Sequence, residues 1–288
     1  MADATGALDE EAARYCADQV RRFDHDRYLC ALFMPTPARP ATLALYAFNV
    51  EVARIRELVR EPMMGQIRLQ WWREVIEHAP QGDLRQHPVA QSLGAAIRAH
   101  ALPQGPFEAL LVARERDLDN EPPETLSELE AYAQATSSGL IELSLHLLGE
   151  RGAAVREAAQ HVGIAWALTG LLRAMPYHAS RRQIFLPRDM SAAAGLDIEA
   201  MIAGRAGEPL RVVARQVGDA ARVHLRKARA LRADVPRTAV PALLPAVLAD
   251  RYLGRLERRG FSLFDPSVQR PAGDRAARLL WASLRGRY

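Results

Sequence analysis

Apolar side chains recur at helical spacing along most of the chain. Between Asp9 and Phe23, for example, Ala12, Tyr15, Cys16 and Val20 would share one helix face. Comparable patterns, separated by prolines, glycines and short polar runs, predict helices over residues 40–59, 63–77, 87–101, 106–117, 127–148, 151–175, 197–204, 208–232, 239–260 and 273–287. No stretch alternates with period two, so strands are not predicted.

The segment from Leu43 to Arg73 forms the centre of the predicted helical arrangement. It predicts a long central helix that ends near Val59, a corner at Glu61-Pro62, and a second helix that closes on Trp71 and Trp72. A capping-box pattern begins at Ser127. The segment 176–187 contains two prolines and is expected to be irregular. Because neither a repeat nor a Gly/Ser linker divides the chain, residues 1–288 are expected to form one all-α domain.

Composition fits a globular protein, with 49% hydrophobic and 25% charged residues in a chain of 288. The formal charge is +4, and every basic side chain except Lys227 is an arginine. A GC-rich genome would explain that bias, and an anion-binding pocket is the alternative, because guanidinium groups match phosphate geometry. No basic run carries interleaved aromatic residues, so nucleic acid is not an expected partner.

Cys16 and Cys30 do not form a CxxC pair, which fits a reducing compartment. The acidic start of the chain is unlike a signal or transit peptide, and no apolar run reaches the roughly 20 residues that span a bilayer. A cytoplasmic location is therefore expected, with peripheral contact at the inner membrane left open.

Metal and phosphate motifs of the common kinds do not occur. The eight histidines are scattered, and HExxH, GxSxG, phosphate-loop and GxGxxG patterns are absent from the sequence. The acidic run Asp117, Asp119, Glu121 and Glu124 lacks the glycine turn and ligand order of a Ca²⁺ loop. It is interpreted as a solvated loop.

Two longer stretches carry a resemblance. They are LALYAFNVEVARIRE followed by QIRLQWWREVIE, and GIAWALTGLLRAMPYHASRRQIFLP. Together they resemble the two signature regions of the squalene/phytoene synthase family, over roughly residues 28–187. The resemblance implies an isoprenoid (trans-prenyl) synthase-like helical bundle with a central cavity. Family members condense prenyl diphosphates, and paired aspartates in each signature hold Mg²⁺ against the diphosphate.

The chain departs from the family at the metal-binding positions. The first aspartate pair is replaced within Ala53-Arg54-Ile55-Arg56-Glu57, which leaves Glu57 as the acid. In the second signature, Ala174 and His178 stand in place of the two aspartates. Pro176 lies between them, so their spacing no longer guarantees a common face. A cluster of Mg²⁺ ions needs several oxygen ligands, and no resident metal or other cofactor is therefore expected.

This pattern most resembles the phytoene-synthase-like subgroup that includes the mitochondrial complex I assembly factor of this fold, as seen in AFNVE, GQIRLQWWRE and MPYHASRRQIFLP. The resemblance implies a non-catalytic role in complex I assembly, with complex I subunits or assembly proteins as partners. No catalytic residue is expected, and an anionic lipid or isoprenoid is the expected ligand. The residues expected to bind it are Tyr46, Arg54, Glu57, Arg68, Trp72, Arg73, Arg173, Arg181 and Arg182.

Alternatives remain for each part of this interpretation. The tandem Trp71-Trp72 fits core packing better than a ligand platform, and the face formed by Tyr46, Val50, Ala53 and Glu57 fits either a cavity wall or core. The arginines fit either the cavity mouth or surface ion pairs. The alternative function is an active prenyl-diphosphate transferase that uses Glu57 and other acids with Mg²⁺.

Overall fold

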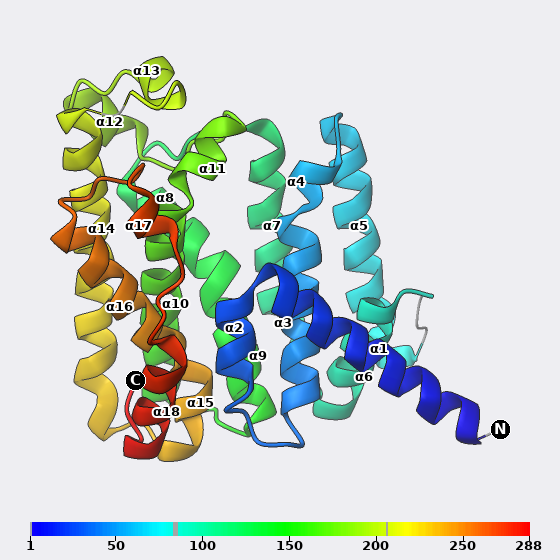
Figure 1. The fold of residues 1–288 in the computed structure, drawn as a ribbon. Helices are drawn as coiled ribbons and strands as arrows, with labels where there is room; N and C mark the ends of the chain where they lie inside the picture. The colour runs from blue at the N-terminus through cyan, green and yellow to red at the C-terminus, as the bar shows by residue number, and fades with distance from the viewer. Residues whose placement is uncertain (1, 83–85, 206) are drawn as a thin grey trace.

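The computed structural model describes residues 2–82, 86–205 and 207–288, and within them all regular structure is helical (Figure 1). The first half of the chain forms α1 (Ala2–Phe23), α2 (His25–Ala31), α3 (Arg39–Ala53), α4 (Ile55–Leu58), α5 (Pro62–His78), η1 (Ala79–Gln81), α6 (Pro88–His100), α7 (Gly105–Asp119), α8 (Leu126–Ala133), η2 (Gln134–Ser138) and α9 (Gly139–Leu147). The second half forms α10 (Ala153–Arg173), α11 (Met175–Ser180), α12 (Arg188–Ala193), α13 (Ile198–Ile202), α14 (Glu208–Ala230), η3 (Leu231–Ala233), η4 (Arg237–Ala239), α15 (Val240–Leu243), α16 (Pro245–Arg258), α17 (Pro266–Gln269) and α18 (Arg275–Arg285).

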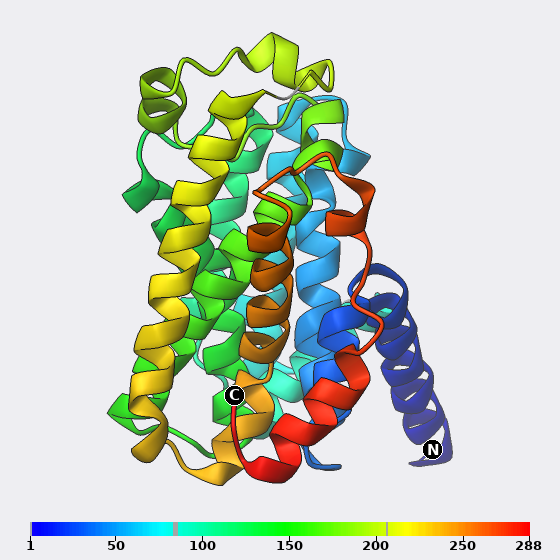
Figure 2. The same ribbon diagram turned by 60° about the vertical axis from the view of Figure 1, so that its left-hand side comes forward.

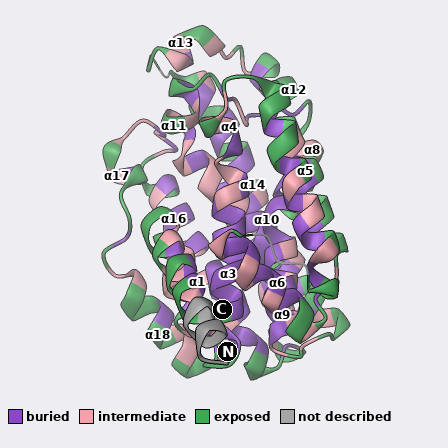
Figure 3. Ribbon diagram, turned by 90° about the vertical axis from the view of Figure 1, so that its right-hand side faces the viewer, coloured by how far each residue is buried: buried purple, intermediate pink, exposed green. Residues whose placement is uncertain are grey.

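Two hydrophobic cores hold the bundle together. One lies among α1, α3, α5, α6, α7 and α9, and includes Phe48, Trp72 and Phe107. The other lies among α8, α10, α14, α15 and α16, and includes Tyr252. Helices α3 and α10 are largely buried (Figure 3), because apolar residues occupy several of their faces. The expectation of an all-α helical bundle is confirmed.

The central helix is shorter than predicted. α3 ends at Ala53, Arg54 has φ −94° and ψ −3°, and the chain continues as the four-residue helix α4. The predicted continuous helix to Val59 is therefore wrong at Arg54. The break turns the end of the first signature without separating Ala53 from Glu57, since both still face the same cavity.

Helix α8 begins earlier than the predicted capping box. Its N-cap is Thr125, whose hydroxyl accepts a hydrogen bond from the amide of Glu128, so the predicted start at Ser127 was wrong by two residues. The chain then runs through a π-helical turn, Gln134–Ser138, into α9. A π turn inserts a residue into the helical register, and periodicity alone did not predict it.

Prolines in first turns explain two further differences. Pro176, in a segment expected to be irregular, lies in the first turn of α11, where its missing N–H leaves no intrahelical bond unmade. Pro245 begins α16 and divides the helix predicted over residues 239–260 into α15 and α16. In the part of the chain that the structure describes, no helix is both long and apolar enough to cross a membrane.

Candidate functional site

A cavity of about 420 Å³ lies between the two halves of the bundle. Its walls come from the end of α1 and start of α2, from α3 and α4, from α10 and α11, and from single residues of α7 and α8 and the η2 turn. The lining residues are Phe23, Asp24, Asp26, Arg27, Asn49, Val50, Ala53, Arg54, Glu57, Arg114, Tyr132, Thr136, Ser137, Trp166, Ala167, Gly170, Leu171, Arg173, Ala174, His178 and Phe185.

The cavity wall contains four arginines and three carboxylates, and neighbours balance most of these charges. Arg27 binds Asp24 at 2.8 Å, and Arg114 binds Asp117 just outside the wall at 3.0 Å. The contact between Arg54 and Glu57 is looser, at 3.9 Å. Since the Arg54 guanidinium also lies 3.9 Å from the ring centre of Phe23, it is held mainly by stacking, which leaves its N–H groups available to an anion.

The inner part of the wall is polar. Arg27 donates a hydrogen bond to Ser137 Oγ at 3.2 Å, and its guanidinium lies 5.8 Å from the ring centres of Tyr46 and Trp166. Beside them, Asn49 is 5% exposed and its Oδ1 receives no hydrogen bond from the described residues. An unsatisfied amide oxygen is costly to bury, so a donor from water or a ligand would stabilise it.

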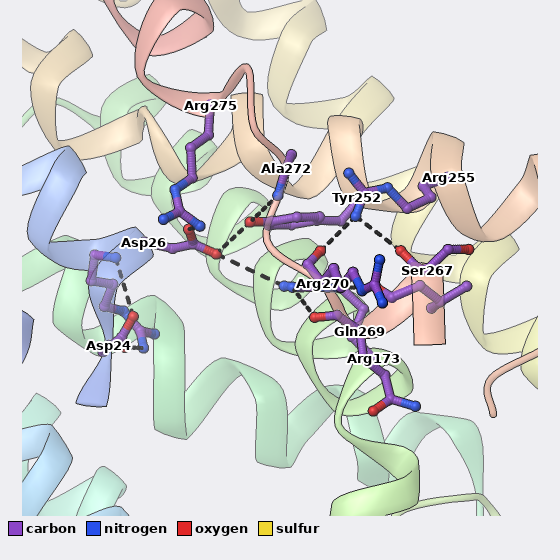
Figure 4. A network of polar contacts seen from close by, with 12 residues as sticks. Asp24, Asp26, Arg173, Tyr252, Arg255, Ser267, Gln269, Arg270, Ala272 and Arg275 are labelled. Atoms are coloured by element: carbon purple, nitrogen blue, oxygen red, sulfur yellow. Dashed lines mark hydrogen bonds and ion pairs between the residues drawn. The ribbon is translucent and has the colours of Figure 1, made fainter. Parts of the chain in front are cut away.

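A buried polar network closes the wall on the side of the C-terminal segment (Figure 4). Tyr252 donates a hydrogen bond to Asp26 at 2.7 Å, and Arg275 lies 3.4 Å from the same carboxylate. Arg173 stacks on the Tyr252 ring at 3.4 Å and donates to the carbonyl of Gln269 at 3.3 Å. Burial lowers the pKa of Arg173 below its ordinary value.

The four positions at which the sequence predicts a loss of metal ligands lie together in the cavity. Ala53, Glu57, Ala174 and His178 all line it, so Pro176 does not move His178 to another face. The His178 amide donates to the Ala174 carbonyl at 3.0 Å, which keeps the helical offset across the break. Burial lowers the pKa of His178, so the neutral imidazole is favoured there. Within the described ranges, no three His, Cys, Asp or Glu side chains are arranged to hold a metal ion.

Glu57 has a neighbour that the sequence did not indicate. Burial, followed by the nearby carboxylate of Glu57, raises the pKa of Tyr177 of α11. Glu57 at the end of the first signature therefore lies near Tyr177 of the second signature.

The predicted arginine group at the cavity mouth is divided in the structure. Arg54 and Arg173 line the cavity. Arg68 lines a separate pocket beside Trp71 and Trp72, and Arg73 binds Glu108 and Glu115 of α7 at 2.9 and 2.7 Å. Arg68 and Arg73 therefore lie outside this group, because Arg68 shares its pocket with Glu51, Ile55 and His87 and Arg73 faces α7.

The remaining predicted ligand residues also lie outside the wall. Arg181 stacks on Tyr177 at 4.8 Å, and Arg182 forms an ion pair with Glu199 on an exposed turn. Tyr46 is buried behind Arg27, and Trp72 packs edge-on against Phe48 in the core with ring centres 5.1 Å apart. The core interpretation of Trp72 is the one that the geometry supports. Ligand binding by any of these residues stays a prediction.

Sequence reasoning missed several wall residues. Asp24 is the N-cap of α2, Asp26 and Arg27 lie in the first turn of α2, and Arg114 comes from α7. The one available signal was the density of charge in FDHDR before an apolar run. Asp117 was also misjudged as part of a solvated loop, because it lies at the end of α7 and accepts a hydrogen bond from Tyr132 at 2.9 Å.

This helical bundle around a charged cavity is the isoprenoid synthase fold. It superimposes on a crystal structure of a dehydrosqualene synthase in complex with ligand with a TM-score of 0.82, at 20% identity and over 96% of each chain. The family model for squalene/phytoene synthase matches residues 20–277. The chain belongs to the squalene/phytoene synthase family.

Two curated relatives have names that state different roles. The "NADH dehydrogenase (ubiquinone) complex I, assembly factor 6" of Bos taurus is 36% identical over 257 residues, which cover 89% of this chain and 77% of that protein. The phytoene synthase of Arthrospira platensis is 25% identical, over 98% of this chain and 96% of that one. The chain is thus similar to both, with higher identity to the assembly factor.

Proposed function

We propose that this protein is a non-catalytic member of the family that assists the assembly of respiratory complex I, and that its cavity holds an anionic amphiphile. The observation that carries the first part is the identity to complex I assembly factor 6, which extends over 89% of the chain. The replacement of motif aspartates by Ala53, Ala174 and His178 supports the absence of turnover, because these side chains supply no oxygen ligand for Mg²⁺.

The cavity wall supports the proposed ligand class. Arg54 is the arginine whose carboxylate contact is loosest, and its side chain is 33% exposed, so an anionic headgroup would reach it at little cost. Val50, Ala167 and Leu171 provide apolar wall for an acyl or isoprenoid tail. In this proposal the arginines contact the headgroup directly, and no metal ion or cofactor is required.

Lipid extraction of the purified protein followed by mass spectrometry tests the ligand. The wild-type protein is expected to carry an anionic amphiphile, and Arg54→Gln is expected to lose most of it. Arg73→Gln is the matched control, since Arg73 is bound to two glutamates away from the cavity. A wild-type protein that carries no anionic amphiphile, or equal loss in the two variants, would contradict ligand binding at Arg54.

Gene deletion in the source organism tests the assembly role. Native gel electrophoresis with an NADH dehydrogenase stain is expected to show less assembled complex I, with recovery when the wild-type gene is restored. Partners would be complex I subunits or assembly proteins, with peripheral membrane contact at the site of assembly. Unchanged complex I in the deletion strain would refute this role.

A transferase is the second candidate, favoured by the three carboxylates of the wall and by the similarity to a phytoene synthase. Incubation with farnesyl or geranylgeranyl diphosphate and Mg²⁺ decides between the two functions. No diphosphate release is expected above the level without protein. Release that Glu57→Gln abolishes would overturn the non-catalytic proposal.

A further inference from the structure

Helix α18 is apolar on two opposite sides. Its inner side is anchored on the bundle through Leu279, which is fully buried, and through Tyr288 just beyond the helix, which donates a hydrogen bond to the Ala228 carbonyl at 3.0 Å. Its outer side presents Leu280, Trp281 and Leu284, which are 52%, 58% and 69% exposed. Figure 2 shows α18 lying obliquely on the outside of the bundle. Packing against the core therefore does not account for this outer apolar stripe, which is formed by Leu280, Trp281 and Leu284.

Cations border this stripe. Arg278, Trp281 and Arg285 are spaced as neighbours along one side of the helix, and the Arg285 guanidinium stacks 4.0 Å from the Trp281 ring centre. The segment 275–288 contains four arginines and no Asp or Glu. Arg275 and Arg278 bind Asp26 and Asp274, whereas Arg285 and Arg287 have no carboxylate partner among the residues that the structure describes.

We infer that the outer face of α18 docks on an anionic lipid surface. A helix with a Trp/Leu stripe bordered by arginines lies in the plane of a membrane interface, with the apolar side chains among the acyl chains and the cations at the headgroups. A second copy of this chain fits the face poorly, because a twofold contact would bring Arg278 and Arg285 against the same residues of the partner. The inference rests on the peripheral membrane contact included in the proposed function, and it identifies α18 as the part of the protein that makes this contact.

Vesicle flotation with the full chain tests this face. The wild-type protein is expected to bind vesicles of phosphatidylcholine mixed with phosphatidylglycerol, and to bind pure phosphatidylcholine at least about tenfold less. The triple variant Leu280→Ser, Trp281→Ser, Leu284→Ser is expected to bind the anionic vesicles at least about tenfold more weakly than the wild-type protein does. Full burial of a single such side chain contributes roughly that factor to binding. Circular dichroism checks that the variant remains folded.

A second exposed apolar group provides the matched control. Leu58, Met63 and Met64 are 52%, 70% and 50% exposed around the corner between α4 and α5. The variant Leu58→Ser, Met63→Ser, Met64→Ser is expected to bind anionic vesicles as the wild type does. Equal loss in both triple variants, or wild-type binding that ignores lipid charge, would overturn the inference, as would no binding to any vesicle.

The charge contribution has its own variant. Arg285→Gln with Arg287→Gln is expected to abolish the preference for anionic vesicles and to leave weak binding through the apolar stripe. An unchanged preference would refute a role for these cations. All α18 variants should still carry the amphiphile proposed for the cavity, so failure of the docking face is distinguishable from failure of the cavity ligand.

Discussion

Gly163 allows α10 to approach the π-helical turn that forms part of the cavity wall. A Cβ atom at this position would come within 2.5 Å of the backbone nitrogen of Ser138. The obstacle is backbone, which a rotamer change cannot move. Ser138 Oγ also donates to the Gln160 carbonyl at 2.8 Å, so displacement of the turn would break this bond. The variant Gly163→Ala should therefore destabilise the protein despite the higher helix propensity of alanine.

The magnitude follows from two opposing effects. Overpacking against an immobile neighbour costs about 1–3 kcal/mol, and loss of the Ser138 hydrogen bond adds about 1 kcal/mol. Alanine in place of a mid-helix glycine stabilises the folded state by roughly 0.5–1 kcal/mol. The net loss is about 3 kcal/mol at the upper end. With an unfolding entropy of about 2.1 cal/mol/K per residue over 288 residues, this lowers the Tm by about 5 °C.

Gly170 in the same helix is the matched control. Apart from the adjacent residues and the backbone of its own helix, a Cβ atom there would have no heavy atom within 4 Å. Gly170→Ala should therefore raise the Tm by about 1 °C through helix propensity alone. Differential scanning calorimetry of both variants measures the two shifts. A Tm of Gly163→Ala equal to that of the wild type, or shifts of the same sign in both variants, would refute the close-approach argument.

Three further predictions concern buried polar groups. Tyr252→Phe removes the donor to Asp26 and should lower the unfolding free energy, measured in urea, by about 1.5–3 kcal/mol. Tyr288→Phe should lower it less, because the Tyr288 hydroxyl donates to the neutral carbonyl of Ala228. Equal losses in the two variants would contradict a charge-assisted bond to Asp26. His161 Nδ1 lies 2.9 Å from His224 Nδ1, and burial, followed by the charge of His224, lowers the pKa of His161 below 6.5. The native state then binds fewer protons than the unfolded state, so stability is complete above pH 6.5 and falls below it, and His161→Gln should flatten that dependence in unfolding curves between about pH 7.5 and 5.5. Burial raises the pKa of Cys16 to about 11 and raises that of Cys30, so neither thiol should react with a disulfide reagent at pH 8 until the protein is denatured, and a rapid native reaction would contradict their burial.

The helices could be predicted because their patterns are local. Repeats of apolar side chains every three to four residues identified the long helices, and prolines identified most breaks. The errors lie where one residue changes the backbone without changing the pattern. Arg54 interrupts α3 through a turn conformation that its side chain does not specify, and Pro176 was read as a helix breaker although it fits a first turn.

The cavity was only partly predictable, for a reason of chain topology. Ala53, Arg54, Glu57, Ala174 and His178 were identified because they occupy motif positions, and they do line the cavity. Asp24, Asp26, Arg27 and Arg114 reach it from helices with no motif. The contacts that join them to other parts of the wall are distant in sequence, as with Arg27 and Ser137, which are 110 positions apart. Such contacts leave no periodic signal in a single sequence.

The Tyr252–Asp26 bond joins residues 226 positions apart and completes one wall of the cavity. During synthesis, α2 and α3 leave the ribosome long before α16, at a rate of roughly 5–20 residues per second. For tens of seconds, the Asp26 carboxylate and the apolar faces beside it would have no partner from the second half of the chain. The N-terminal core can form in that interval, whereas the cavity cannot, so this stage of biosynthesis is the one at which a holding chaperone would matter most.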